Sequence, residues 1–284
     1  MKLQVTKEGY LLDYLIENEQ RYSKKDLKNF LTKGRIMVNG QVQTYYRYLL
    51  QPQDIIELTK TTKSKLPFEI IYEDQELIVI NKPSGLLSMA SERERTKTAY
   101  HLVSEYIKQE NKKARLFIVH RLDQNTSGVL MFAKNEKIKN DLQASWNDLV
   151  LKRGYKAIVE GKMKSKEGTI QTYLKETKTQ LVYSSKSKEG KLAITHYKTL
   201  KENGRYTLLE VYLDTGRKNQ IRVHMQELGH PIIGDTKYGA KTNPIKRLGL
   251  HSHKLEFVHP YTKKIMLFEA KEPESFNQLF RKGK

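Results

Sequence analysis

Apolar residues repeat at helical spacing in two places near the start of the chain, at 11–16 and at 27–31. This periodicity predicts two short amphipathic helices. Ser23, with Asp26 three positions later, is expected to cap the second helix, because serine and an acidic residue at this spacing can each satisfy a backbone N–H group. Gly34 is expected to end that helix, since glycine readily adopts the left-handed conformation found there.

A hairpin and a closing strand follow these helices. The dipeptide Asn39-Gly40 stands between two short extended runs, which is typical of a tight β-turn. A further strand is expected at 54–58. Residues 1–60 are therefore interpreted as a small domain of helices and a β-hairpin, and the polar, lysine-rich stretch 61–68 as a linker.

Beyond this stretch, short apolar runs of strand length alternate with polar turns. Strands are expected at 70–72, 77–80, 116–119, 128–133, 155–159, 208–213 and 267–269. Helical spacing recurs at 98–108 and at 220–228, and Gly229 is expected to end the second of these helices. Strands with interspersed helices predict an α+β domain over residues 69–284, built on a mixed, largely antiparallel sheet.

The charge balance indicates what this domain binds. The chain has 52 Lys and Arg against 32 Asp and Glu, a net charge of +20. Such a surplus indicates a polyanionic partner, because cations near phosphates release condensed counterions; a generally basic, solvated surface is the alternative. Most of the surplus lies beyond residue 60, so the larger domain is expected to meet the polyanion itself. The lysine-rich stretch 161–191 is expected to be either an RNA-facing excursion or a solvated hairpin.

Composition also excludes several classes of protein. The chain has no cysteine, which excludes a disulfide framework, a thiol nucleophile and a cysteine-ligated metal. No apolar run approaches the roughly 18 residues that a membrane helix needs, and the N-terminus lacks the apolar core of a signal peptide. We therefore expect a soluble, cytoplasmic protein that makes no membrane contact and is a monomer by default.

The first segment with chemical character is His120–Gly128, which reads HRLDQNTSG and separates two expected strands. Asp123 stands at a strand end, flanked by Arg121, where its carboxylate can project into a cleft. The alternative is that Asp123 caps a turn or helix that begins near Thr126. The residues by themselves leave both interpretations open.

Two further segments carry clustered polar groups. In Thr215–His224, the side chains of Arg217, Arg222 and His224 cannot all be buried without partners. Arg222 is expected to pair with Asp123 and keep it ionised; a surface helix with solvated cations is the alternative. The segment 229–239, with three glycines and a proline, is interpreted as a structural loop.

Taken together, these segments resemble the A-type large-subunit (RluA) family of pseudouridine synthases, which act on ribosomal and transfer RNA. The matching motifs are Asn81–Leu86 (NKPSGL), His120–Lys134 (HRLDQNTSGVLMFAK), Arg153–Gly161 (RGYKAIVEG), Arg217–His224, Gly229–Gly239 and Arg247–His251. They follow the family's order over residues 69–275. The resemblance implies isomerisation of uridine to pseudouridine within RNA, without metal or cofactor.

The resemblance also implies roles for three catalytic residues. Asp123 acts at the anomeric carbon, either by adding to the sugar or by abstracting a sugar proton. Tyr155 stacks on the flipped uracil and takes or relays the C5 proton. Arg222 orients the carboxylate of Asp123.

Substrate contacts are implied for a further set of residues: Asn81, Lys82, His120, Arg121, Arg217 and Gln220. Among these, Arg121 is expected to fill the space that the flipped base vacates. The chain departs from the pattern at Lys218-Asn219, where many members have Thr-His. This departure is expected to affect RNA contacts more than the chemistry.

Residues 1–60 resemble the small alpha-L RNA-binding domain. Leu12-Asp13, Gly34, Val38-Asn39-Gly40 and Asp54-Ile55-Ile56 match its pattern. Leu11 stands where an arginine usually precedes Leu-Asp. An alpha-L domain on this catalytic domain suggests ribosomal RNA as the substrate, with transfer RNA as the alternative.

Three other functions compete with this interpretation. A non-catalytic RNA-binding factor on the same scaffold would bind RNA without needing Asp123. A metal-dependent nuclease would use the following residues: His224, His230, Asp235, His251 and His253. Their spacing matches no common metal motif. A glycosidase would need a second carboxylate near Asp123, and the sequence shows none there.

Overall fold

The computed structural model describes residues 2–32, 34–58, 66–92, 94–185, 187–281. Contacts divide the chain into two compact units, Met1–Lys65 and Leu66–Lys284. The linker expected at 61–68 falls largely outside the described residues. Each unit is therefore described by itself.

The N-terminal unit combines two helices with a four-stranded sheet of order β1-β6-β3-β4 and a two-stranded β2-β5 pair. Its elements are β1 (Lys2–Gln4), β2 (Gly9–Tyr10), α1 (Leu11–Asn18), α2 (Lys24–Thr32), β3 (Ile36–Val38), β4 (Gln41–Gln43), β5 (Leu49–Leu50) and β6 (Ile55–Leu58). One apolar core, which includes Leu15, Leu31 and Ile56, joins the helices to the sheet. The unit thus has its own hydrophobic core.

Local signals in this unit are confirmed. The Oγ of Ser23 accepts from the backbone N–H of Asp26 and donates to its carboxylate, at 3.2 and 2.7 Å. Gly34 has φ +63°, and Asn39 and Gly40 both have positive φ, as a tight hairpin turn between β3 and β4 requires.

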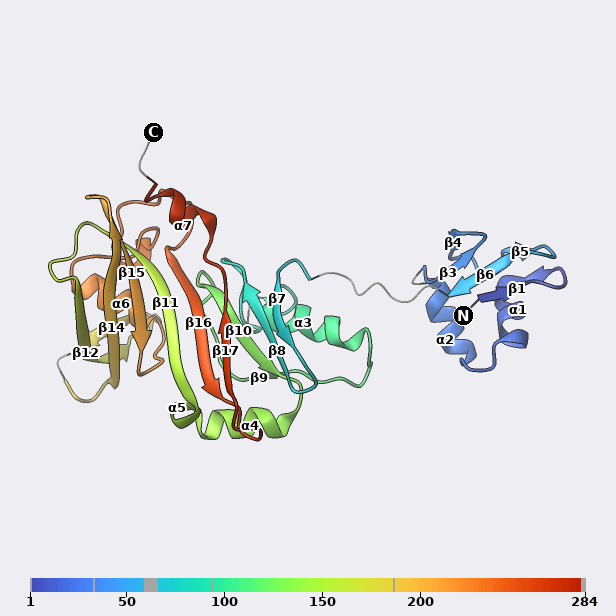
Figure 1. The fold of residues 1–284 in the computed structure, drawn as a ribbon, viewed down its shortest axis with the longest axis horizontal. Coiled ribbons are helices and arrows are strands. Elements are labelled where there is room, and N and C mark those ends of the chain that lie inside the picture. The colour runs from blue at the N-terminus through green and yellow to red at the C-terminus, as the bar shows by residue number, and fades with distance from the viewer. Residues whose placement is uncertain (1, 33, 59–65, 93, 186, 282–284) are drawn as a thin grey trace. The chain divides into compact units, whose positions relative to one another are not determined.

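The C-terminal unit is built on one large sheet, with the order β13-β12-β14-β15-β11-β16-β10-β8-β7 (Figure 1). Two further strands, β17 and β9, pair with β16 and β10. The strands are β7 (Ile70–Glu73), β8 (Leu77–Lys82), β9 (Phe117–Ile118), β10 (Ser127–Ala133), β11 (Val150–Glu160), β12 (Glu167–Glu176), β13 (Val182–Ser185), β14 (Lys191–Glu202), β15 (Tyr206–Leu213), β16 (Leu250–Val258) and β17 (Ile265–Glu269). The sheet is mixed and largely antiparallel, so the predicted α+β fold is confirmed.

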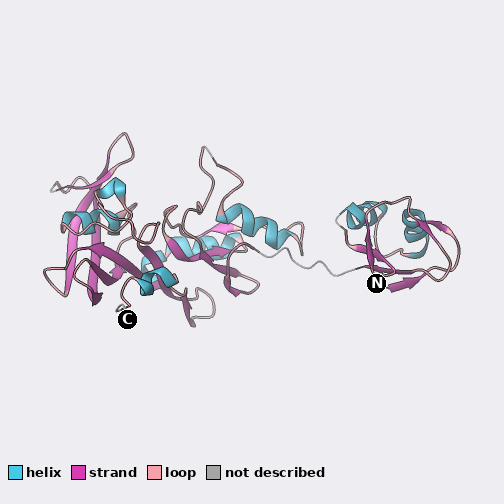
Figure 2. Ribbon diagram, turned by 90° about the horizontal axis from the view of Figure 1, so that it is seen from above, coloured by secondary structure: helices cyan, strands magenta, loops and turns pink. Residues whose placement is uncertain are grey.

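Helices pack on this sheet (Figure 2). They are α3 (Ala99–Lys108), α4 (Glu136–Ala144), α5 (Trp146–Leu149), α6 (Gln220–Glu227) and α7 (Glu274–Gln278), with a 3₁₀ turn η1 at Thr236–Tyr238. Alternate residues of β8 and β10 face opposite cores: Ile78 and Ile80 pack with α3, whereas Leu77 and Val79 pack with α4. Both faces of these central strands are therefore buried, which explains their uninterrupted apolar sequences. None of the helices in the described part of the chain is both long and apolar enough to cross a membrane.

The strands expected from the sequence are present, with small shifts at their ends, and so are the helices at 98–108 and 220–228. The stretch 161–191 forms the β12–β13 hairpin and reaches the start of β14. The segment after Thr126 continues as strand β10, so no helix follows Asp123. Strands β14 and β16, the short strands β1, β2 and β5, and helices α4, α5 and α7 were not predicted.

The pairing of strand β16 with both β10 and β11 positions the candidate site. Strands β10 and β16 run parallel, with Gly128 opposite Ser252, and Ser252 is also the partner of Tyr155 on β11. Because the 120–126 segment enters β10 directly before Gly128, this register brings the segment that carries Asp123 next to Tyr155. An added Cβ at Gly128 would lie 1.9 Å from the Ser252 carbonyl oxygen, so only glycine permits the close approach.

Replacing Gly128 by alanine is expected to lower the free energy of unfolding by at least about 3 kcal/mol, because backbone strain at φ +113° adds to a backbone clash. Gly204→Ala is the matched control: φ is +81° but nothing lies within 4 Å of the added Cβ. It should cost only about 1–2 kcal/mol. Urea unfolding of both variants measures the difference. Equal losses in the free energy of unfolding would show that the close approach to Ser252 adds no cost to the Gly128→Ala substitution.

Candidate active site

A narrow cavity of about 90 Å³ lies between the 120–126 segment, β11 and the start of α6. Its lining includes six of the residues predicted from the sequence: Arg121, Asp123, Tyr155, Arg217, Gln220 and Arg222. They come from segments up to a hundred residues apart. The predicted catalytic residues Asp123, Tyr155 and Arg222 thus share one cavity.

The loop that carries Asp123 is held from both sides of that residue by the loop that follows β8. Ser88 Oγ donates to the Leu122 carbonyl and accepts from the Leu122 N–H, at 2.7 and 3.1 Å. Gly85 and Gln124 exchange two hydrogen bonds, at 3.0 and 3.1 Å. The backbone of Asp123 itself closes a turn by accepting from the Thr126 N–H. The carboxylate is therefore carried by a rigid segment.

Lys82 lies beneath this loop with no exposed surface. Its Nζ donates to the carbonyl oxygens of Pro83, Leu86 and Gln124, at 3.0, 2.7 and 3.0 Å. Burial lowers the pKa of Lys82 to about 7, and the charge of Asp123 opposes this change. Because three carbonyl acceptors also favour an ammonium, we treat Lys82 as a buried cation that ties the two loops together.

The predicted pairing of Arg222 with Asp123 requires correction. The guanidinium of Arg222 makes a bidentate ion pair with Asp235 instead, through Nε and Nη2, both at 2.7 Å. Burial by itself lowers the pKa of Arg222. The hydrogen bonds that Arg222 donates to Asp235 and the negative charges of Asp235 and Asp123 together outweigh burial, so the pKa of Arg222 is raised. The arginine is therefore fixed by a second carboxylate, buried beside the cavity, and faces Asp123 with its charge.

Two more residues complete the setting of Arg222. Asn219 accepts from Arg222 Nη1 at 2.8 Å and donates to Tyr238 Oη at 3.1 Å. The Tyr238 ring lies 4.8 Å from the guanidinium carbon. The departure at Lys218-Asn219 was expected to concern RNA contacts, but the buried Asn219 side chain holds the arginine of the site. Likewise, the segment 229–239, interpreted as a structural loop, supplies both Asp235 and Tyr238.

Sequence reasoning missed Asp235 although a signal existed. A buried arginine needs a carboxylate partner, and the Arg222 side chain is only 12% exposed. The sequence alone does not show which acidic residue pairs with Arg222, and the prediction therefore named Asp123 in place of Asp235.

Tyr155 forms the wall opposite α6. Burial raises the pKa of Tyr155, although Arg153 and a hydrogen bond with Ser252 act in the other direction. Its phenol is therefore neutral at physiological pH and presents an aromatic surface to the cavity.

Gln220 and Arg217 shape the loop that enters α6. The Gln220 side chain accepts from the Arg217 N–H and the Thr215 hydroxyl, both at 2.9 Å. It donates to the Ile194 carbonyl and to Thr195 Oγ1. Gln220 is therefore occupied within the protein, whereas the exposed Arg217 keeps its two terminal nitrogens for a ligand.

Three residues predicted to contact substrate do not line this cavity. Lys82 is enclosed beneath the loop, as described above. Asn81 lies on β8 and donates to Glu69 at 3.3 Å. His120 accepts the Met131 N–H at its Nε2, at 3.1 Å, and burial lowers its pKa to about 4. These three residues therefore lie outside the cavity that holds Asp123, and the substrate contacts predicted for them stay predictions.

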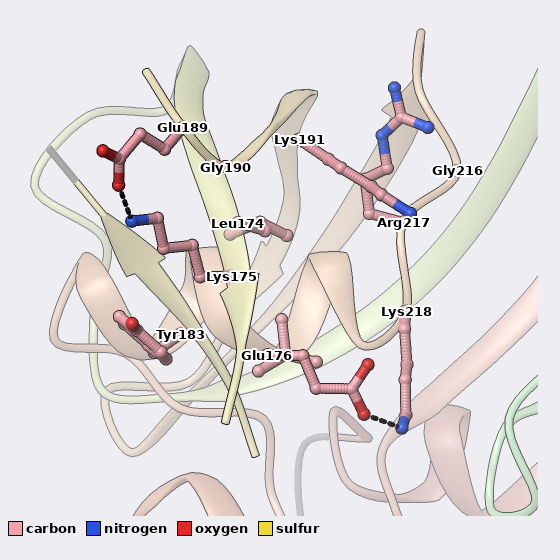
Figure 3. Close-up of a pocket in the computed structure, with 11 residues that line it drawn as sticks. Leu174, Lys175, Glu176, Tyr183, Glu189, Gly190, Lys191, Gly216, Arg217 and Lys218 are labelled. Carbon is pink, nitrogen blue, oxygen red and sulfur yellow. Dashed lines mark hydrogen bonds and ion pairs between the residues drawn. The ribbon is translucent and has the colours of Figure 1, made fainter. Parts of the chain in front are cut away.

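A second, larger cavity of about 580 Å³ shares Gly216 and Arg217 with the first (Figure 3). Its two carboxylates are neutralised, because Glu189 pairs with Lys175 at 2.5 Å and Glu176 pairs with Lys218. Arg217 Nε donates to the Leu192 carbonyl, which places the guanidinium beside Lys191. Within the described ranges, Lys191 and Arg217 have no carboxylate partner, so this groove is positive where it adjoins the first cavity.

The residues of the metal-nuclease alternative are engaged elsewhere. His224 hydrogen-bonds with Thr172 and Thr195, Asp235 holds Arg222, and His251 bonds with Ser127. In the part of the chain that the structure describes, no three His, Asp or Glu side chains gather as a metal site.

Replacing Asp235 by asparagine is expected to destabilise the protein by about 3–5 kcal/mol, because it leaves the buried Arg222 charge without its partner. Glu176→Gln is the control: it breaks an ion pair with Lys218 in which both side chains are about 40% exposed, and should cost less than about 1 kcal/mol. Thermal unfolding of the two variants gives the comparison. A loss below 1 kcal/mol for Asp235→Asn would contradict a stabilising role for the buried pair.

Comparison with known proteins bears on this geometry. The family model for RNA pseudouridylate synthases matches residues 76–227. An uncharacterized RNA pseudouridine synthase of Bacillus subtilis (strain 168) is 31% identical, with 96% of this chain and 93% of that protein aligned. The ribosomal large subunit pseudouridine synthase D of Pasteurella multocida (strain Pm70) is 30% identical, with 98% and 92% aligned.

Solved structures agree on the fold. Human RNA pseudouridylate synthase domain containing 4 superimposes with a TM-score of 0.61 at 24% identity, covering 73% of this chain and 90% of that chain. Human RNA pseudouridylate synthase domain containing 1 gives 0.58 at 22% identity. The matched family model spans both Asp123 and Arg222, and more than half of the chain. This chain therefore belongs to the RNA pseudouridine synthase family.

Proposed function

We propose that this protein converts specific uridines of ribosomal RNA to pseudouridine, with Asp123, Tyr155 and Arg222 in the roles described below. The observation that carries the proposal is the single cavity in which these three side chains meet. Family membership supports the reaction, and the residue roles are those that the family motifs imply for side chains lining this cavity.

The reaction exchanges one bond for another at the anomeric carbon. The bond from C1′ to N1 of uracil breaks, the detached base turns, and a bond from C1′ to C5 forms. The proton on C5 is lost and N1 gains one, so the product is an isomer of uridine. The base must first leave the helical stack, since its reacting atoms are hidden there.

Asp123 is the group that we place at the anomeric carbon. Whether a carboxylate adds to the sugar or removes a sugar proton, it must be ionised. Lys82 below the loop and Arg222 across the cavity are close enough for the charge of Asp123 to act on the pKa of both. Both cations therefore lie within electrostatic reach of the proposed catalytic group.

Tyr155 is proposed to stack on the flipped uracil. Its neutral, partly buried phenol suits this role better than that of a general base, because removal from water raises the pKa of Tyr155. Arg121, exposed at the rim of the cavity, is placed to enter the duplex where the base has left.

The RNA substrate is the finer part of the proposal. The relatives from Pasteurella multocida and Vibrio cholerae are named as ribosomal large subunit pseudouridine synthases, which favours ribosomal RNA over transfer RNA. The surplus of positive charge beyond residue 60 supports direct contact with phosphates. We propose that the N-terminal unit makes a second binding contact with the RNA.

Asp123→Asn is expected to abolish pseudouridine formation, a loss of at least about 10³-fold, while RNA affinity stays within a few-fold. Carbodiimide treatment and primer extension on unmodified ribosomal and transfer RNA transcripts, in the presence of a chelator, map the product. Asp148→Asn, on the exposed face of α5, is the matched control and should retain full activity. Wild-type protein that binds RNA tightly but forms no product on any transcript or on assembled ribosomal particles would favour a non-catalytic binding factor.

Lys191→Gln is expected to weaken RNA binding and to reduce the slope of log affinity against log salt by about 0.7, the value for one phosphate contact on a single strand. Lys198→Gln changes the same charge on an exposed residue of β14 outside the groove, and should leave the slope unchanged. Titrations of a 12-residue uridine oligonucleotide at four salt concentrations measure both. Identical slopes of log affinity against log salt for the two variants would show that the groove does not contact the RNA.

A further inference from the structure

A third cavity, of about 300 Å³, opens on the other side of Arg121. It shares Arg121, Tyr155, Leu213 and Gly216 with the uridine cavity, but Asp123 and Arg222 do not line it. The two cavities are therefore neighbours separated by Arg121 and Tyr155. Nothing in the chemistry of the reaction requires the third one.

An aromatic side chain lies in its wall. Trp146, the only tryptophan of the chain, packs partly against the core beneath the sheet and partly lines the cavity. Its ring centroid lies 5.3 Å from that of His120, with 35° between the planes. Tyr155 contributes a second aromatic ring. Such surfaces bind nucleobases by stacking, whatever the base.

His120 supplies a fixed hydrogen-bond donor. Because its Nε2 accepts the Met131 N–H, the neutral ring must carry its proton on Nδ1. Within the described residues, His120 Nδ1 has no hydrogen-bond partner, and this atom is accessible to solvent. The N–H of His120 is thus available to an acceptor from outside the protein.

Gln143 and Arg153 add further polar groups. Gln143 uses its Nε2 to bind the carbonyls of Ile118 and Val119, at 3.0 and 3.2 Å, which leaves its Oε1 as an acceptor. Arg153 Nη2 donates to the Asp214 carbonyl. No ion pair to Arg153 is present in the described part of the chain. The cavity therefore combines ring surfaces with one donor, one acceptor and a cation.

We propose that this cavity is a second nucleobase site, which takes a base adjacent to the target uridine out of the RNA stack while Arg121 separates the two. Stacking on Trp146 holds the base, and His120 and Gln143 read a carbonyl and an N–H on its edge. Arg153 faces the backbone phosphate that links the two nucleotides. This inference rests on the proposed function in assuming that RNA is the substrate.

The single tryptophan makes the site directly observable. The full-length Asp123→Asn protein is titrated with a 12-residue uridine oligonucleotide and with a 12-residue ribose-phosphate chain that lacks bases. The base-containing RNA should quench the Trp146 emission, and the base-free chain, which carries the same charge, should not. Trp146 does not line the uridine cavity, so quenching reports the second site.

Variants at Trp146 separate stacking from structure. Trp146→Leu keeps an apolar contact with the core but removes the ring, and should weaken binding of the uridine oligonucleotide about 10-fold, as expected for one stacked base. Its affinity for the base-free chain should not change. Trp146→Phe should retain most of the affinity. Binding of the variants is measured by the anisotropy of 5′-labelled RNA.

Absence of quenching at saturation, or an equal loss of affinity for both RNAs in Trp146→Leu, would overturn the second site. Pseudouridine formation by the wild-type protein is measured separately. If no pseudouridine forms but base-dependent quenching persists, the proposed function fails and the second base site stands.

Discussion

The close approach of strands β10 and β16 is the constraint on which the site depends. At this point a glycine with positive φ lets the backbone of β10 lie against the Ser252 carbonyl. Ser252 in turn is the register partner of Tyr155. The parallel contact therefore fixes the separation between the loop that carries Asp123 and the strand that carries the aromatic wall. Any side chain at position 128 would push these two apart.

Buried cations then hold the parts of the site in place. Lys82 satisfies three loop carbonyls from below, and Arg222 is clamped by Asp235, Asn219 and Tyr238. In the part of the chain that the structure describes, neither cation forms an ion pair with Asp123. Such an arrangement is costly to bury but pre-organised, and pre-organised charge is the main means by which enzymes stabilise charged transition states.

Much of the fold could be predicted from the sequence, because it rests on local periodicity. The apolar runs of β8 and β10, the Ser23 cap and the Asn39-Gly40 turn each carry their own signal. Strand β14 was missed because its buried positions are Ala193, Thr195 and Tyr197, so strongly apolar residues do not mark its buried face. The family motifs include six residues that line one cavity, yet they gave no information on contacts between segments.

For the same reason the roles of Lys82 and Asp235 could not be predicted. The motif implied a substrate contact for Lys82, and only the fold shows that its ammonium donates to the Gln124 carbonyl within the protein. The partner of Arg222 lies 13 residues away across a turn, where sequence spacing carries no geometric information. His120 was predicted to contact the substrate because it lies in a family motif, whereas its place beside Trp146 is a property of the sheet and α5.

The cluster around Arg222 has a consequence for sequence divergence within the family. Asn219 adopts φ +55°, a conformation that asparagine tolerates better than most residues, and it bridges the arginine to the Tyr238 hydroxyl. Because one side chain contacts both groups, a substitution at 219 disturbs the arginine and the tyrosine together. Position 219 therefore carries a constraint that its exposed neighbour Lys218 does not share.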